Sequence, residues 1–115
     1  MNRRRSLLAA ALAAAALLGS APILAADPYP SRPIRIVVPY PPGGSADLIG
    51  RMVAERMSKS IGQPVVVENK AGATGAIGSE FVARADPDGH TLLVGIADTH
   101  AINPAVVARL PYDPV

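Results

Sequence analysis

The chain has 115 residues, which is room for one domain at most. It has no Cys, which excludes a disulfide framework, and with no Trp, one Phe and three Tyr it is poor in the aromatic residues that stack nucleic-acid bases. Three of its 11 basic residues and none of its 9 acidic residues lie in residues 1–26, so residues 27–115 carry a net charge of −1 and we expect no nucleic-acid partner.

The first 26 residues are typical of a secretory signal peptide. Three arginines precede an apolar run at 7–18, and small residues follow it. This run is too short to cross a bilayer, which needs about 20 apolar residues. Cleavage is expected near Ala26, because Pro22 directly follows the alternative small-residue site. The pattern is compatible with either the general or the twin-arginine export route.

A strand, a loop and a helix are then predicted in direct succession. Apolar β-branched residues at 34–38 predict a buried strand of a parallel sheet. Residues 39–44 hold three prolines and two glycines, which excludes both helix and regular strand. Ser45 is the expected N-cap of a helix that ends at Ile61, before Gly62. The apolar positions of this helix fall mostly on one face: Leu48, Ile49, Met52, Val53, Met57 and Ile61.

The same alternation continues along the chain. The predicted elements are a strand at 65–68, a glycine-bearing loop at 69–75, a helix at 75–85, a turn at 86–89, a strand at 91–96, a loop at 97–100 and a weak helix at 101–110. Right-handed crossovers make the strands of such a chain parallel, with their following loops at one edge of the sheet. The predicted fold class is therefore α/β, a parallel βαβαβ arrangement with three loops around one crevice.

The first of these loops is the strongest candidate for a ligand site. Gly43 and Gly44 let a ligand approach the main chain, and the N–H groups of Ser45 and Ala46 would point at an anion. Asp47 in the first helical turn complements the helix dipole. A plain strand-to-helix turn with an ordinary cap is the alternative. The full set of candidate binding residues is Gly43, Gly44, Ser45, Ala46, Asp47, Gly72, Ala73, Thr74, Gly75, Ala97 and Thr99.

The second loop carries a glycine pattern without a known phosphate fingerprint. Residues 72–78 spell GxxGxxG, which is neither the dinucleotide motif GxGxxG nor a phosphate-binding P-loop. We interpret 72–75 as a second cluster of donors that faces the first. Gly78 is expected to let its helix pack closely on the sheet. Thr99, in the third loop, is expected to donate its hydroxyl to a bound carboxylate.

Metal binding and catalysis are both disfavoured. Asp98 and His100 are neighbours, but a metal site needs a further ligand, and His90 precedes a strand near the other edge of the sheet. Ser45 could complete a triad with these two residues in a small secreted serine hydrolase, yet no GxSxG elbow is present. We expect no cofactor, no metal and no enzymatic activity.

Several segments carry a family resemblance. They are YPSRPI at 29–34, VPYPPGGSAD at 38–47, GQPVVVENK at 62–70, GATG at 72–75, DGHTLL at 88–93 and NP at 103–104. In this order they resemble the Bug family, the extracytoplasmic solute receptors of tripartite tricarboxylate transporters. The resemblance implies a periplasmic, non-enzymatic receptor whose two α/β lobes close on a small organic carboxylate. Main-chain N–H groups and hydroxyls at 43–47, 72–75 and 97–99 would hold this ligand, partly through water.

The resemblance also implies a domain organisation and partners. Residues 27–115 would be the first part of an N-terminal ligand-binding lobe, a fragment whose second lobe is missing. The protein would serve the membrane permease subunits of a tripartite transporter, or a sensing pathway. Ala71 stands where members often have Pro and Ala76 where Asn is common, so the carboxylate specificity does not carry over. A non-functional truncated remnant is the remaining alternative.

Overall fold

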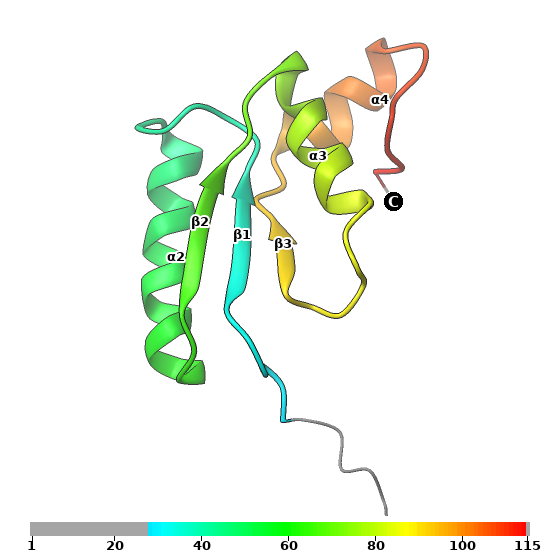
Figure 1. Ribbon diagram of the computed structural model, residues 1–115. Helices are drawn as coiled ribbons and strands as arrows, with labels where there is room; N and C mark the ends of the chain where they lie inside the picture. The colour runs from blue at the N-terminus through cyan, green and yellow to red at the C-terminus, as the bar shows by residue number, and fades with distance from the viewer. Residues whose placement is uncertain (1–27, 115) are drawn as a thin grey trace, which may run out of the picture.

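The computed structural model describes residues 28–114, so the predicted signal peptide and its cleavage near Ala26 lie outside the described residues (Figure 1). Helices and strands alternate along the chain. In order they are β1 (Ile34–Val38), α2 (Ser45–Ile61), β2 (Val65–Asn69), the short turn η1 (Ala73–Gly75), α3 (Ala76–Ala83), β3 (Thr91–Leu93), the π-helical turn η2 (Asp98–Ile102) and α4 (Asn103–Val106).

The three strands form one parallel sheet in the order β2-β1-β3. Ile36 of the central strand lies opposite Val67 on one side and Leu92 on the other. Apart from the exposed Arg35, β1 is buried, as expected for a strand covered on both faces. The predicted α/β class with a parallel βαβαβ order is confirmed.

The two long helices cover opposite faces of this sheet. Val38 of β1 contacts α2 at Gly50, whereas Arg35 lies over the ring of Phe81 in α3. Residues 35 and 38 point to opposite faces, because side chains alternate along a strand. Figure 1 shows the same arrangement, with α2 beside β2 and α3 beside β3. No helix in the range 28–114 is long and apolar enough to span a membrane.

Helix α2 has the predicted bounds but a different cap and a different buried face. Its N-cap is Gly44 rather than Ser45, and Gly62 ends it with a left-handed φ of 68°. The residues that α2 buries are small or polar: Asp47, Gly50 and Ala54. Leu48, Ile49, Met52 and Val53 are 44–62% exposed, so the apolar face points away from the sheet. Small residues allow the helix axis to lie close to β1, since a Cβ on Gly50 would be only 2.9 Å from Val38.

The segment after β3 departs most from the prediction. β3 has three residues instead of the six expected at 91–96, although Val94 N still donates to Val37 O at 2.9 Å. Most of the predicted loop at 97–100 lies in the turn η2, and of the weak helix predicted at 101–110 only Asn103–Val106 forms α4. The hydroxyl of Thr99 bonds both N–H and C=O of Ile96, at 3.2 and 3.0 Å, which draws the chain into a turn.

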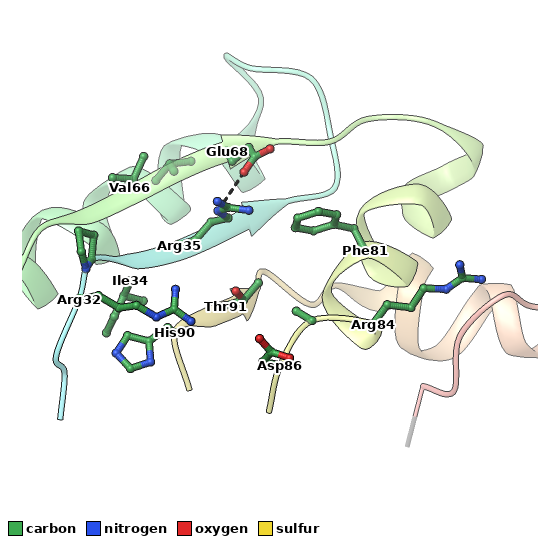
Figure 2. Close-up of a pocket in the computed structure, with 13 residues that line it drawn as sticks. Arg32, Ile34, Arg35, Val66, Glu68, Phe81, Arg84, Asp86, His90 and Thr91 are labelled. Carbon is green, nitrogen blue, oxygen red and sulfur yellow. Dashed lines mark ion pairs between the residues drawn. The ribbon is translucent and has the colours of Figure 1, made fainter. Parts of the chain in front are cut away.

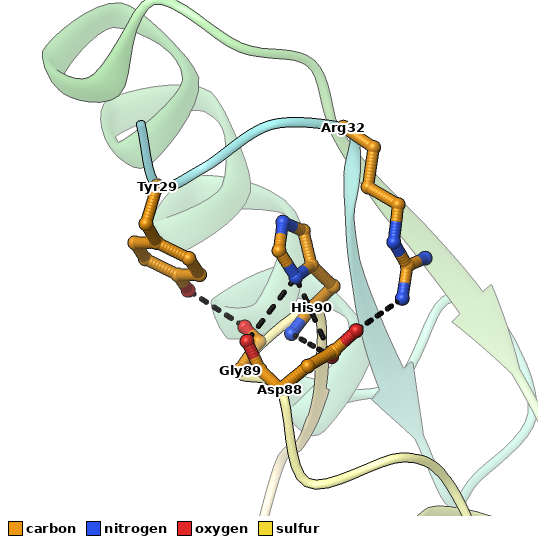
Figure 3. A network of polar contacts seen from close by, with 5 residues as sticks. All are labelled: Tyr29, Arg32, Asp88, Gly89 and His90. Atoms are coloured by element: carbon orange, nitrogen blue, oxygen red, sulfur yellow. Dashed lines mark hydrogen bonds and ion pairs between the residues drawn. The ribbon is translucent and has the colours of Figure 1, made fainter. Parts of the chain in front are cut away.

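The amino end of the described chain is tied to the turn before β3. The Tyr29 hydroxyl donates to Gly89 O at 2.7 Å, and the Arg32 guanidinium pairs with Asp88 at 2.6 Å (Figure 3). Asp88 also accepts a bond from the N–H of His90 at 2.9 Å. These contacts join segments that precede β1 and β3, at the amino ends of the strands. The opposite edge of the sheet is left to the three loops.

Candidate functional site

The loops that follow the three strands meet at the carboxyl edge of the sheet. Gly75 marks the meeting point: a Cβ there would be 2.6 Å from Cγ2 of Thr99 and 3.3 Å from the hydroxyl oxygen of Tyr40. In the sheet, β2 lies on one side of β1 and β3 lies on the other. The strand order therefore reverses at β1, which makes it a topological switch point. Open α/β sheets bind ligands in the crevice at such a point.

The first loop presents the free end of α2. The first helical bond runs from Leu48 N to Gly44 O at 3.0 Å, which leaves the N–H groups of residues 45–47 without an intrahelical acceptor. Gly43, Gly44 and Ser45 are exposed, so an anion can reach these donors. The arrangement combines main-chain donors with the positive end of a helix dipole.

Asp47 lies behind this loop and holds it in shape. Its side chain is 7% exposed and accepts bonds from Gly43 N at 2.9 Å, Arg51 Nε at 3.0 Å and Asn69 Nδ2 at 2.9 Å. Arg51, followed by the other two donors, lowers the pKa of this carboxyl to about 2. The negative charge is therefore fixed and already partnered by groups of this chain. Residues 51 and 69 were not among the sequence-predicted site residues, although the i,i+4 spacing of Asp47 and Arg51 is a recognisable signal.

The second loop has an unusual backbone. The φ angles of Gly72, Ala73, Thr74 and Gly75 are 132°, 47°, 52° and 84°, all in the left-handed region. Such a conformation costs about 1–3 kcal/mol for a residue other than Gly, and it occurs preferentially at functional sites. The buried side chain of Asn103 donates to Thr74 O at 2.9 Å and holds this backbone in place.

The third loop uses its polar side chains internally. Thr99 is fully buried, and its hydroxyl bonds Ile96 and lies 2.7 Å from Nδ1 of His100. Tyr40 donates to Asp98 at 2.9 Å, which links the first loop to the third. Burial and this carboxylate raise the pKa of Tyr40 to about 12. Ala97 is exposed beside them.

The contacts give no support to a catalytic triad or a metal centre. His100 bonds Thr99 and Asp98 bonds Tyr40, and within residues 28–114 no hydrogen bond joins Ser45 to His100. No group of three potential metal ligands occurs within the described part of the chain.

A cavity of about 610 Å³ lies elsewhere, on the face of the sheet next to α3 (Figure 2). Arg35 in its wall pairs with Glu68 at 3.2 Å and lies 5.7 Å from the ring centre of Phe81. This pair neutralises two of the charges in the wall. The carboxyl edge, with main-chain donors that have no partner in the helix, is the better candidate for an anion site.

The fold and the loops together define a class: a parallel α/β sheet with exposed main-chain donors beside the carboxyl ends of its strands. The profile of a family described as "Tripartite tricarboxylate transporter family receptor" matches residues 49–115. The chain belongs to this family, which confirms the predicted resemblance. The family is one of receptors, not of enzymes, so the expectation of no enzymatic activity agrees with it.

Relatives from several bacteria share much of the sequence. The protein BugT of Bordetella pertussis is 44% identical over 98 residues, which is 84% of this chain and 30% of BugT. A UPF0065 protein from the tcbD-tcbE intergenic region of Pseudomonas sp. (strain P51) is 46% identical over 112 residues, or 97% of this chain and 32% of that protein. The chain thus spans about a third of the length of these relatives.

Solved structures of the same kind superpose on the chain. MatC from Rhodopseudomonas palustris with bound malate has a TM-score of 0.72 at 42% identity and covers 75% of this chain and 29% of its own. R. palustris Rpa4515 with adipate has a TM-score of 0.72 at 37% identity, and the match again covers 75% of this chain and 29% of the other. A structure described as a periplasmic transporter gives a TM-score of 0.74 at 57% identity, and the match covers 76% of this chain and 29% of that structure's chain.

Proposed function

We propose that the protein is a periplasmic receptor that binds a small organic carboxylate and delivers it to a tripartite transporter. Membership of the receptor family supports the class, and the bound malate and adipate of two solved relatives support the chemistry of the ligand. The observation that carries the proposal is the exposed amino end of α2, where the main-chain N–H groups of residues 45–47 have no acceptor within the helix.

In this proposal the ligand carboxylate bonds the N–H groups of Ser45 and Ala46. The second donor cluster, at 72–75, lies across the crevice. Charge-assisted bonds of this kind are stronger than neutral ones. Asp47 would not repel the ligand strongly, because Arg51 is paired with it at 3.0 Å. The hydroxyl of Thr99 is buried within its turn, so in this loop Ala97 is the better placed for a ligand contact.

A ligand panel tests the proposal. The protein, at the length made in the cell and after export, is melted alone and with malate, adipate, citrate, glutamate or an aromatic acid. A ligand at about 100 times its Kd adds about 2.7 kcal/mol to the free energy of unfolding, which gives a clear rise in melting temperature. If none of these acids raises the melting temperature, the proposal is wrong.

Two substitutions test whether the main chain holds the ligand. Gly44 has an extended backbone (φ −83°, ψ 174°), and a Cβ there would meet only Pro41 O at 3.9 Å, so Gly44→Val fits the fold. Its bulk would keep a carboxylate from the N–H groups. The ammonium of Lys70 is occupied, 2.7 Å from Glu68 and 4.1 Å from the ring centre of Phe81. We expect Gly44→Val to abolish binding and Lys70→Ala to leave most of it; the reverse ranking would indicate recognition by side-chain charge.

The truncated-remnant alternative makes its own prediction. It requires residues 27–115 to be largely unfolded when produced alone, which far-UV circular dichroism of that segment would measure. A folded spectrum with a cooperative melt would count against it.

A further inference from the structure

We propose that Asn69, the last residue of β2, is a positioning residue that holds the loop at 41–44, directly before the donors of α2, in its binding conformation before the ligand arrives. This inference rests on the proposed function, and it assigns a role to a side chain that would not itself touch the ligand.

The side-chain amide of Asn69 contacts both sides of the first loop. Its Nδ2 donates to Tyr40 O at 3.1 Å, near the start of the loop, and to Asp47 Oδ1 at 2.9 Å, just after its end. Its Oδ1 accepts a bond from Arg51 at 3.2 Å. With both amide hydrogens and the carbonyl oxygen in use, only one orientation of the amide satisfies all three partners.

Asp47 passes this constraint to the glycine that precedes the donors. One of its oxygens faces Asn69, and the other accepts bonds from Gly43 N at 2.9 Å and Arg51 Nε at 3.0 Å. Gly43 has a φ of 90°, in a region that glycine enters and leaves easily. Without the bond to Asp47, the loop would sample many conformations, and the ligand would have to order it on binding.

Packing would not replace this clamp. The loop residues 41–45 are all exposed, so packing does little to fix their backbone. The pairing of β2 with β1 depends on the main chain, including the bond from Lys70 N to Val38 O at 2.9 Å. Replacing the side chain of Asn69 removes its bonds to Tyr40, Asp47 and Arg51, which loosens the loop, and it leaves the sheet ladder intact.

The test compares Asn69→Ala, Asn69→Asp and the wild type at the length made in the cell. Gln63→Ala is the matched control, since Gln63 carries the same amide group at the far end of α2. Affinity for malate and adipate is measured by titration calorimetry, and the melting temperature of each variant is measured without ligand. We expect Asn69→Ala to lose at least tenfold in affinity, and Asn69→Asp to lose more, because its charge would face Asp47.

A second readout follows the loop itself. The amide resonance of Gly43 reports the ionisation of Asp47, because the two are hydrogen-bonded. Loss of the Asn69 donor raises the pKa of Asp47, so in Asn69→Ala this resonance should titrate at a higher pH than in the wild type. A generally destabilised protein would not move this midpoint selectively.

The outcomes separate the two proposals. Unchanged affinity in Asn69→Ala, in a wild type that binds, overturns the positioning role while the receptor function stands. An unmoved Gly43 titration also overturns it, as does an equal loss of affinity in Gln63→Ala. A wild type that binds no carboxylate overturns the receptor function, and the Gly43 titration then decides alone whether Asn69 fixes the loop.

Discussion

The close approach of α3 to the sheet gives a quantitative prediction for Gly78→Ala. A Cβ on Gly78 would lie 2.9 Å from Lys70 O and 2.9 Å from Pro39 Cα, at least 0.5 Å inside the ordinary contact range of 3.4–4 Å. Both are main-chain atoms, so relief requires the helix to move. Overpacking costs about 1–3 kcal/mol, and Ala recovers about 1 kcal/mol of helix propensity. We expect a net loss of up to about 2 kcal/mol.

Gly50→Ala is the matched control for this prediction. It gains the same helix propensity, but its Cβ would meet side-chain methyl groups, Val38 Cγ2 at 2.9 Å and Val94 Cγ2 at 3.5 Å, which can shift more easily than main chain. Thermal melts followed by circular dichroism measure both variants, where 1 kcal/mol corresponds to about 2–8 °C depending on domain size. If Gly50→Ala lowers the melting temperature as much as Gly78→Ala or more, the reasoning is refuted.

Two further predictions concern pH. The pKa of Tyr40 is raised to about 12, so the stabilisation from its neutral hydroxyl is complete below pH 10 and is lost as pH rises towards 12; Tyr40→Phe should flatten the melting temperature over this range. The pKa of Asp88 is lowered to about 2 by the N–H of His90 and by Arg32, so its stabilisation is present above pH 3.8 and is lost as pH falls through 2. The difference in melting temperature between the wild type and Asp88→Asn should therefore shrink between pH 5 and pH 2, and a constant difference would contradict this assignment.

The bounds of α2 could be predicted because its stop signals are local. Gly62 and Pro64 end the helix, and the glycines and prolines before Ser45 keep it from starting earlier. Its buried face could not be predicted in the same way. Apolar periodicity pointed to the stripe with Leu48 and Met52, which is exposed, whereas the sheet packs against the small residues Gly50 and Ala54, because they allow a closer approach.

The candidate site shows the same division between local and distant information. The glycine-rich loops could be placed at one edge of the sheet from the sequence, because their position depends only on the order of strands and helices along the chain. The side chains that fix the loops could not be identified, because their partners are remote: Asn69 lies 22 residues from Asp47, and Asn103 lies 29 residues from Thr74. β3 was predicted too long for a different, local reason: Thr99 bonds Ile96, three residues before it, in a turn that the apolar pattern does not reveal.

The place of β1 in the sheet has a consequence for the order of folding. β1 is the first strand along the chain, yet it lies in the middle, with Val67 and Leu92 on its two sides. A chain that emerges amino end first exposes both edges of β1 until its later partners arrive. The β1–β2 pair is available early, but the sheet is complete only after β3, a nonlocal pairing of the kind that folds slowly. The segment should therefore stay unfolded until nearly all of it has been made.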